Sequence, residues 1–198
     1  MVNVYGQTGL VPSGTLHANS EVRTRRYAVL STNAVAIFLG DVVKLVTTGG
    51  GTATGLPCVN GMSSASADMV GVVVGIFDST GKPMIHPTYH LAASTAGYVM
   101  VADDPDSEFM VRVNDPDYGV TYLTDSSIGD EADLIFGAGN TKTGNSGFEL
   151  STTMKGVGQQ GMFRIERLAP LPGNTWAPNA MVIISFAEHL RKAARVAV

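Results

Sequence analysis

Short apolar runs rich in valine and isoleucine recur along this chain, and glycine, proline, aspartate and asparagine separate them. Runs of this length and composition are typical of β-strands. No long amphipathic helix pattern lies between them, which favours an antiparallel sheet over a βαβ arrangement. We therefore predict an all-β fold, an antiparallel β-barrel or jelly-roll-like sandwich of about nine strands, at residues 34–40, 41–48, 69–77, 97–102, 108–114, 121–124, 132–137, 161–170 and 180–188.

Alternation of apolar and polar side chains identifies the inner face of two of these runs. Phe109, Val111 and Val113 would face the core, opposite Met110 and Arg112. In the run at 161–170, the alternation would place side chains 163, 165 and 167 on one face and 164, 166 and 168 on the other.

The two ends of the chain differ from this pattern. Residues 1–30 have no hydrophobic period and are expected to form an extended N-terminal arm, followed by one β-domain over 31–188 and a basic tail over 189–198. Ser185 and Glu188 have capping-box spacing, and Phe186 and Leu190 could share a helical face with alanines of the tail. A short C-terminal helix is therefore a further expectation.

Composition and charge narrow the class of protein. Charged residues make up 15% of the chain, against about 25% in an average globular protein, and 23 residues are glycine. This combination suits an all-β protein rich in turns, or one whose surface neighbouring subunits cover, because charge is depleted at the centres of interfaces.

Charge is also unevenly distributed. Residues 103–133 hold ten acids and one base, a net charge of −9, whereas the rest of the chain has 12 bases and 7 acids, a net charge of +5. An acidic chain is a poor match for the phosphate backbone, so nucleic acid is not an expected partner. The acidic zone of one copy could dock on the basic zone of another; solvated loop charges are the alternative.

No apolar stretch reaches 18 residues and the N-terminus lacks a signal-peptide pattern, so we expect a soluble chain with no membrane partner, made in a cytoplasm. The single cysteine, Cys58, cannot form an intrachain disulfide or build a zinc site alone. It is expected to be a small buried hydrophobic residue.

The densest cluster of candidate functional residues is the acidic passage around Asp103, Asp104 and Asp106. An EF-hand loop would need glycine at its sixth position and glutamate at its twelfth. Neither register fits: counted from residue 103 these positions are Glu and Asn, and counted from residue 104 they are Phe and Asp. An irregular calcium site remains an alternative. We favour a turn between two strands with solvated aspartates, because Asp before Pro promotes turns and Asp side chains bond turn amides.

Other motifs are incomplete. His86 and His90 have the four-residue spacing of helical metal ligands, but Pro87 and the strand-like surroundings oppose a helix. Residues 144–148 have Asn where the serine loop of trypsin-like proteases has Asp, and the glycine-rich residues 49–55 lack the Lys-Ser/Thr of a P-loop. We therefore expect no catalytic residue, no cofactor and no metal ligand, and a protein that is not an enzyme.

Three passages together resemble the capsid decoration or cement proteins of tailed bacteriophages. They are the Gly-Asp-led strand at 40–46 with the Val-Gly-rich strand and turn at 69–83, the passage at 98–115 with Asp-Asp-Pro-Asp at 103–106 and Phe109 after it, and the ending at 167–189. The chain departs from the family pattern in its longer N-terminal arm and in the basic tail after His189.

The resemblance implies a β-rich structural protein on the outside of a phage capsid, assembled in the host cytoplasm. Its partners would be the major capsid protein and copies of itself, in a homo-oligomer such as a trimer. The arm and tail become candidate contact segments, and the resemblance carries no catalytic residue. A β-structural protein of a phage tail or baseplate is the alternative.

A carbohydrate-binding or hydrolytic β-sandwich would need clustered aromatic residues or paired carboxylates. Trp176 and scattered tyrosines are the available aromatic platform. Trp176 is expected instead to anchor a loop or an interface.

Overall fold

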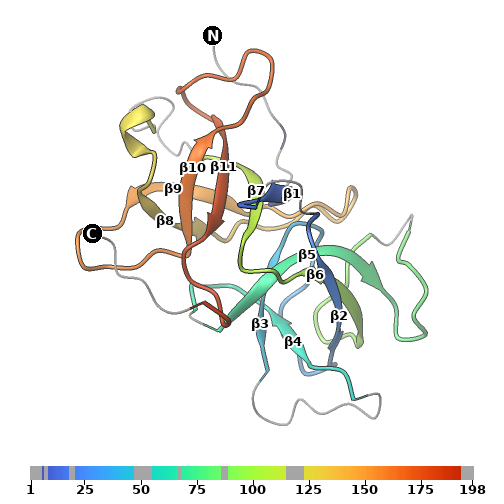
Figure 1. Cartoon of the computed structure of the whole chain (residues 1–198). Coiled ribbons are helices and arrows are strands. Elements are labelled where there is room, and N and C mark those ends of the chain that lie inside the picture. The colour runs from blue at the N-terminus through green and yellow to red at the C-terminus, as the bar shows by residue number, and fades with distance from the viewer. Residues whose placement is uncertain are drawn as a thin grey trace.

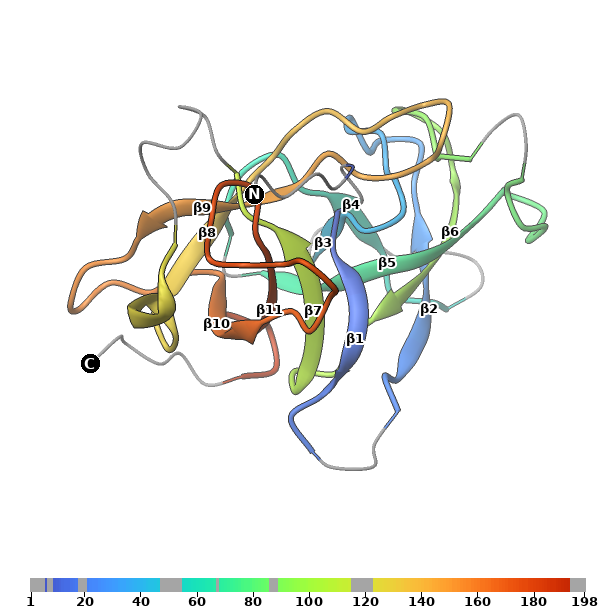
Figure 2. The ribbon, with the colours of Figure 1, turned by 90° about the horizontal axis from the view of Figure 1, so that it is seen from above.

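The computed structural model describes residues 6, 9–17, 21–46, 55–66, 68–85, 89–114 and 123–192. Within these residues the chain forms two antiparallel sheets that pack as a sandwich, together with one short 3₁₀ segment, η1 (Asp125–Ser127) (Figure 1, Figure 2). The predicted all-β class is confirmed, and of the two predicted architectures the sandwich is correct, because the two sheets remain separate.

The first sheet, sheet A, has six strands, in the spatial order β1 (Val11–Thr15), β7 (Ser107–Arg112), β11 (Met181–Phe186), β10 (Phe163–Leu168), β8 (Glu131–Ile135) and β9 (Glu149–Met154). Sheet B has five, in the order β2 (Thr24–Val29), β6 (Gly97–Ala102), β5 (Met69–Phe77), β3 (Val42–Leu45) and β4 (Val59–Gly61). The chain passes from sheet B to sheet A through the acidic turn at 103–106.

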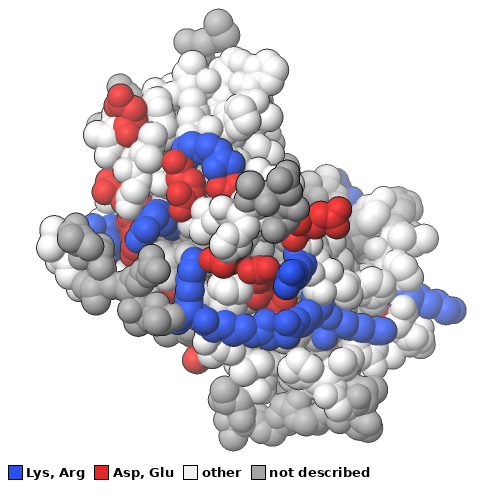
Figure 3. Space-filling model, viewed as in Figure 1, with Lys and Arg blue, Asp and Glu red and all other residues white. Residues whose placement is uncertain are grey.

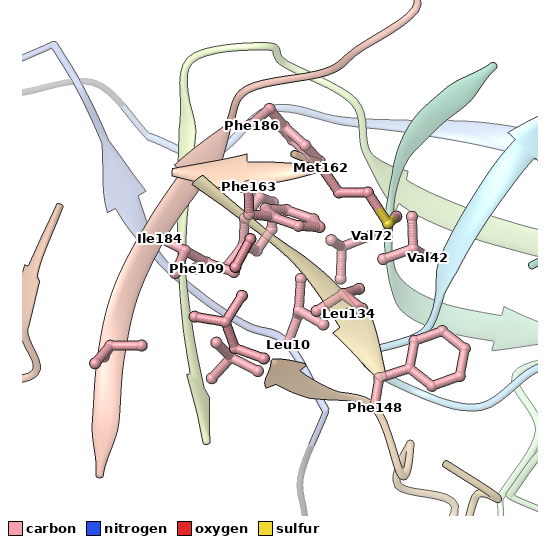
Figure 4. Packing of buried hydrophobic residues seen from close by; sticks show 14 of the residues in the cluster. Leu10, Val42, Val72, Phe109, Leu134, Phe148, Met162, Phe163, Ile184 and Phe186 are labelled. Atoms are coloured by element: carbon pink, nitrogen blue, oxygen red, sulfur yellow. The ribbon is translucent and has the colours of Figure 1, made fainter. Parts of the chain in front are cut away.

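The main core lies between the two sheets. Phe109 and Val111 of β7, both fully buried, point into it as predicted, and Val113 follows just beyond the strand. Phe109 contacts Phe186 of β11 edge to face, with ring centroids 5.1 Å apart. Sheet B contributes Val42 from β3, among others (Figure 4).

Sheet B also has a core of its own. Val43, Val73 and Val101 lie on its other face and pack with Ile37 and Leu91 from the loops. A parallel bridge joins residue 28 of β2 to residue 58 before β4, so the sheet curls around this second core. Burial on both faces explains why the run at 69–77 is almost continuously apolar rather than alternating.

The predicted face of Arg167 is wrong because a β-bulge precedes this residue. Between Ile165 and Arg167 the pairing of β10 with β11 shifts by one residue, so Arg167 stands opposite Ile183. The shift breaks the alternation. Arg167 is therefore half exposed and reaches Glu108, whereas Phe163 and Ile165 stay in the core.

The strand predicted at 34–40 is wrong, and the one predicted at 121–124 is not a strand in its described half. The run at 34–40 makes only isolated bridges, at Ile37 and Leu39, because it turns at residue 40 to enter β3. Of the run at 121–124, residues 123–124 lead into η1 and the first two lie outside the described residues. Conversely, the short polar strands β1, β2, β4 and β9 carry too weak an apolar pattern to be predicted.

The described segments nearest to the two ends of the chain are attached to this body. Within the interval predicted as an arm, β1 pairs with β7 and β2 pairs with β6 along its whole length. The expected C-terminal helix is wrong for residues 185–192: β11 continues through Phe186, and the Ser185 hydroxyl donates to Glu166 rather than capping a helix (2.6 Å). Residues 193–198 lie outside the described part of the chain.

Among the described residues, no helix is long and apolar enough to cross a membrane.

Candidate functional site

The acidic passage forms a tight turn between β6 and β7, as predicted. The amide of Ser107 donates to the carbonyl of Asp104 (3.0 Å), which closes a four-residue turn with Pro105 in its second position. The Asp104 side chain accepts the amide of Asp106 (3.1 Å). Proline at this position and aspartate at the first are both favoured in such turns.

Asp103 is not solvated, which corrects the prediction for this residue. Its side chain is 2% exposed, and its Oδ2 accepts hydrogen bonds from the Tyr27 hydroxyl (2.7 Å) and from Arg191 (2.8 Å). The Arg25 Nε lies 3.5 Å away. A buried carboxylate is tolerated when it is paired and hydrogen-bonded in this way.

Burial raises the pKa of Tyr27 to about 12, and the hydrogen bond to Asp103 and its negative charge add to the effect. Tyr27 is therefore a neutral donor at physiological pH. The phenol and two arginines together hold Asp103, although they come from β2 and from the C-terminal segment.

Asp106 also contacts the C-terminal segment, together with the residues that follow β1. His17, just after β1, approaches its Oδ2 at 3.1 Å, and the Lys192 ammonium lies 3.7 Å from its Oδ1. Lys192 also donates to the carbonyls of Pro105 (3.0 Å) and Phe186 (2.9 Å). Figure 3 shows acidic side chains enclosed by basic ones on this face. We call this cluster the end clamp; its members are Asp103, Asp106, His17, Arg25, Tyr27, Arg191 and Lys192.

His189 is a further anchor that sequence reasoning missed. Its Nε2 lies 2.6 Å from the carbonyl oxygen of Val70 in β5, and the amide of Leu190 donates to the carbonyl of Met69 (2.9 Å). Burial lowers the pKa of His189, so the ring is held neutral. The segment after β11 is thereby attached to sheet B as well as to the acidic turn.

Other carboxylates of the acidic zone form ion pairs on the outer face of sheet A. Glu108 binds Arg167 through two bonds of 2.6 and 2.8 Å. Glu131 binds Arg164 at 3.0 Å, and Asp133 lies 2.5 Å from the Lys155 ammonium. The acidic zone therefore meets basic residues of its own chain to a large extent, rather than being left free for a second copy.

The remaining candidate residues have structural roles or lie outside the described part of the chain. Cys58 is buried, as predicted. Ser146 in the loop at 144–148 is buried, and its hydroxyl accepts the amide of Phe148 (3.0 Å). Trp176 packs against the main core from the loop before β11. His90 stacks on Phe38, with ring centroids 4.8 Å apart.

His86 and residues 49–54 of the glycine-rich stretch lie outside the described residues. In the part of the chain that is described, no three His, Cys, Asp or Glu side chains group in a way that could hold a metal ion.

Comparison of this chain with models of known protein families, with curated proteins and with solved structures found no match.

Proposed function

We propose that this chain is a structural protein of a tailed-phage virion, which binds the outside of the capsid lattice and cements neighbouring major capsid proteins as a homo-oligomer. The sequence resemblance around residues 98–115 motivates the proposal. The observation that carries it from the structure is the end clamp at Asp103.

The end clamp suits a protein that transmits force. Arg25 and Tyr27 belong to β2, and Arg191 belongs to the segment after β11, so these two segments meet at one buried carboxylate. A pull on either segment is shared with the turn that joins the two sheets. A cement protein needs this kind of rigid body, because it holds subunits together through many distributed contacts.

The motif behind the resemblance also has a physical role in this fold. Asp103 and Asp106 hold the clamp, and Phe109 fills the core between the sheets. These positions would be expected to recur in proteins built on the same two-sheet body. The motif therefore has a role in the fold of this chain, and the contact surface is left to be found by experiment.

The test is binding of the purified chain to capsids that carry only the major capsid protein. We expect the chain to co-sediment with the capsids, to saturate at a fixed ratio to the major capsid protein, and to raise the temperature at which the capsids break. Capsids that already carry their full complement of the chain are the control, and they should bind no more.

Binding to purified tails rather than to capsids would move the protein to the tail or baseplate. Binding to neither particle would overturn the proposal.

A further inference from the structure

A pocket of about 360 Å³ lies at the seam between the two sheets, away from the end clamp. The start of β3 and the end of β4 border it on one side, and the connection between β8 and β9 borders it on the other. We call it the seam pocket; its wall includes Phe38, Asp41, Met62, Phe136, Ala138 and Phe148. Figure 4 shows Phe148 at the edge of the main core.

The wall of the seam pocket is held in place by packing and backbone hydrogen bonds. Phe136 and Phe148 meet edge to face at 4.9 Å. Gly139 lies so close to Phe38 that a Cβ at this position would overlap the ring. The amide of Leu39 donates to residue 144 (2.9 Å), and the amide of residue 146 donates back to Leu39 (2.8 Å). The pocket is therefore preformed, as ligand sites usually are.

Asp41 is the buried polar side chain in this mostly apolar wall, which also includes the exposed Ser63. The residue is 3% exposed, and its Oδ2 accepts the amide of Phe38 (2.8 Å). Its Oδ1 is buried, and no hydrogen bond of normal geometry reaches it among the described residues; the nearby Ser146 hydroxyl favours the charged form of the carboxyl without completing such a bond. A buried carboxylate oxygen without a partner is costly, so this atom is a place for a donor from outside the chain.

The raised pKa of Asp41 is consistent with the burial of its carboxyl group. Burial raises the pKa of Asp41 to about 7, against the opposing effects of the Ser146 hydroxyl and the Phe38 amide. Near neutral pH the carboxyl is thus poised between its charged and neutral forms. A positive charge brought into the pocket would favour the charged form.

We propose that the seam pocket binds a compact apolar ammonium ion, whose apolar body lies against Phe38, Phe136 and Phe148 and whose protonated amine donates to Asp41. The volume is ample for one ring, since an apolar cavity of about 150 Å³ holds benzene. Bonds between ammonium and carboxylate groups are about twice as strong as neutral ones. An anion would be repelled, and a purely apolar ligand would leave Oδ1 unpartnered.

The test compares benzylamine with benzyl alcohol, which has nearly the same shape but no charge. Each is titrated by calorimetry at about pH 8, where Asp41 is mostly ionised. We expect benzylamine to bind about tenfold more tightly than benzyl alcohol or better, as a charged hydrogen bond predicts. In Asp41→Asn, which keeps an acceptor for the Phe38 amide, that preference should disappear.

A blocking variant tests the location. Ala36→Phe fills the pocket and should abolish binding of both compounds, whereas Ala92→Phe, at an exposed alanine outside the pocket, should bind as the unmodified chain does. Circular dichroism verifies that each variant is folded. Equal affinity for the two compounds, binding of neither, or unchanged binding by the blocked variant would each overturn the proposal.

The same chemistry is found in free amines and in the lysine side chain of a partner protein. If benzylamine displaces the chain from capsids, the natural occupant is a lysine of the capsid; if attachment is unaffected, the pocket serves a free amine. The titrations need no capsid. Failure of capsid binding and failure of the seam pocket are therefore separate results.

Discussion

At the scale of single residues, Asp41 and Asp103 show how differently two buried carboxylates are accommodated. Asp103 has a phenol and two arginines around it. Asp41 has a backbone amide and the Ser146 hydroxyl, and its pKa rises to about 7. At Asp41 no charged group is among the causes of the shift, so burial favours the neutral acid there.

The raised pKa of Asp41 predicts a specific dependence of stability on pH. Its ordinary pKa is 3.8 and its folded value is about 7. Between these values the folded chain holds a proton that the unfolded chain has lost, so the free energy of unfolding falls as pH rises. The full loss is on the order of 4 kcal/mol, reached once pH exceeds the folded value.

Asp41→Asn should remove that loss. Urea unfolding at about pH 5 and about pH 8 should therefore show a smaller decline for the variant than for the unmodified chain, and higher stability of the variant at the upper pH. Asp130→Asn, at an exposed acid, is the matched control. An undiminished decline in Asp41→Asn would contradict the assignment of this pH dependence to Asp41.

Tyr27 reports on the end clamp by its own ionisation. Burial is the largest cause of its raised pKa of about 12, followed by the hydrogen bond and the charge of Asp103. In Asp103→Asn we expect the pKa to fall but to stay above the ordinary 10.0, because burial persists. Ultraviolet titration of the phenolate, with Tyr27→Phe to identify the signal, measures it. A pKa unaffected by Asp103→Asn would show that the carboxylate is not coupled to the phenol.

At the scale of elements, the segment after β11 depends on a few bonds for its position. Arg191 binds Asp103, and the Leu190 amide binds the carbonyl of Met69 in β5. Neither bond belongs to a sheet ladder. This segment should open more readily than the strands, since local stability follows buried contacts and protected hydrogen bonds.

Removing the guanidinium should therefore loosen this segment first. In Arg191→Ala we expect hydrogen exchange at the Leu190 amide to become about tenfold faster, because one charge-assisted hydrogen bond is lost. Exchange at amides inside β6 should be nearly unchanged. Arg23→Ala, in the same surface hollow, is the comparison. Equal acceleration in both variants would mean that the ion pair with Asp103 does not hold the segment.

At the scale of the whole molecule, the two sheets share one core, and sheet B has a second core of its own. Phe109 lies in the shared core, against Phe186 and residues of sheet B. Val73 lies in the core enclosed by sheet B. Because the larger cluster joins both sheets, we expect one cooperative unfolding transition.

Phe109→Ala should lower the free energy of unfolding by about 3–5 kcal/mol, the usual cost of truncating a buried phenylalanine. Circular dichroism and the fluorescence of Trp176, which packs on the same core, should report a single midpoint. Met110→Ala, on the opposite face of β7, should cost less because Met110 is only partly buried. Two separate midpoints would show that sheet B survives alone on its second core.

Patterns in the sequence predicted a structural feature correctly where the contacts that determine it join residues close together in the chain. The inward face of β7 follows from alternation along one strand, and the turn at 103–106 follows from Pro105 and its aspartates. The bulge before Arg167 could not be predicted in this way, because it depends on the partner strand β11. The same holds for β1 and β2, which are strands only because β7 and β6 supply their hydrogen-bond partners.

The sequence by itself determined the all-β class, the turn and the inward face of β7, since these depend on neighbours a few positions away. Only the tertiary structure decided that Asp103 is buried, because Tyr27 and Arg191 lie 76 and 88 positions from it along the chain. It also decided that Asp41 lines a pocket between the sheets. Burial and charge pairing depend on which distant segments meet, and no short-range pattern encodes that.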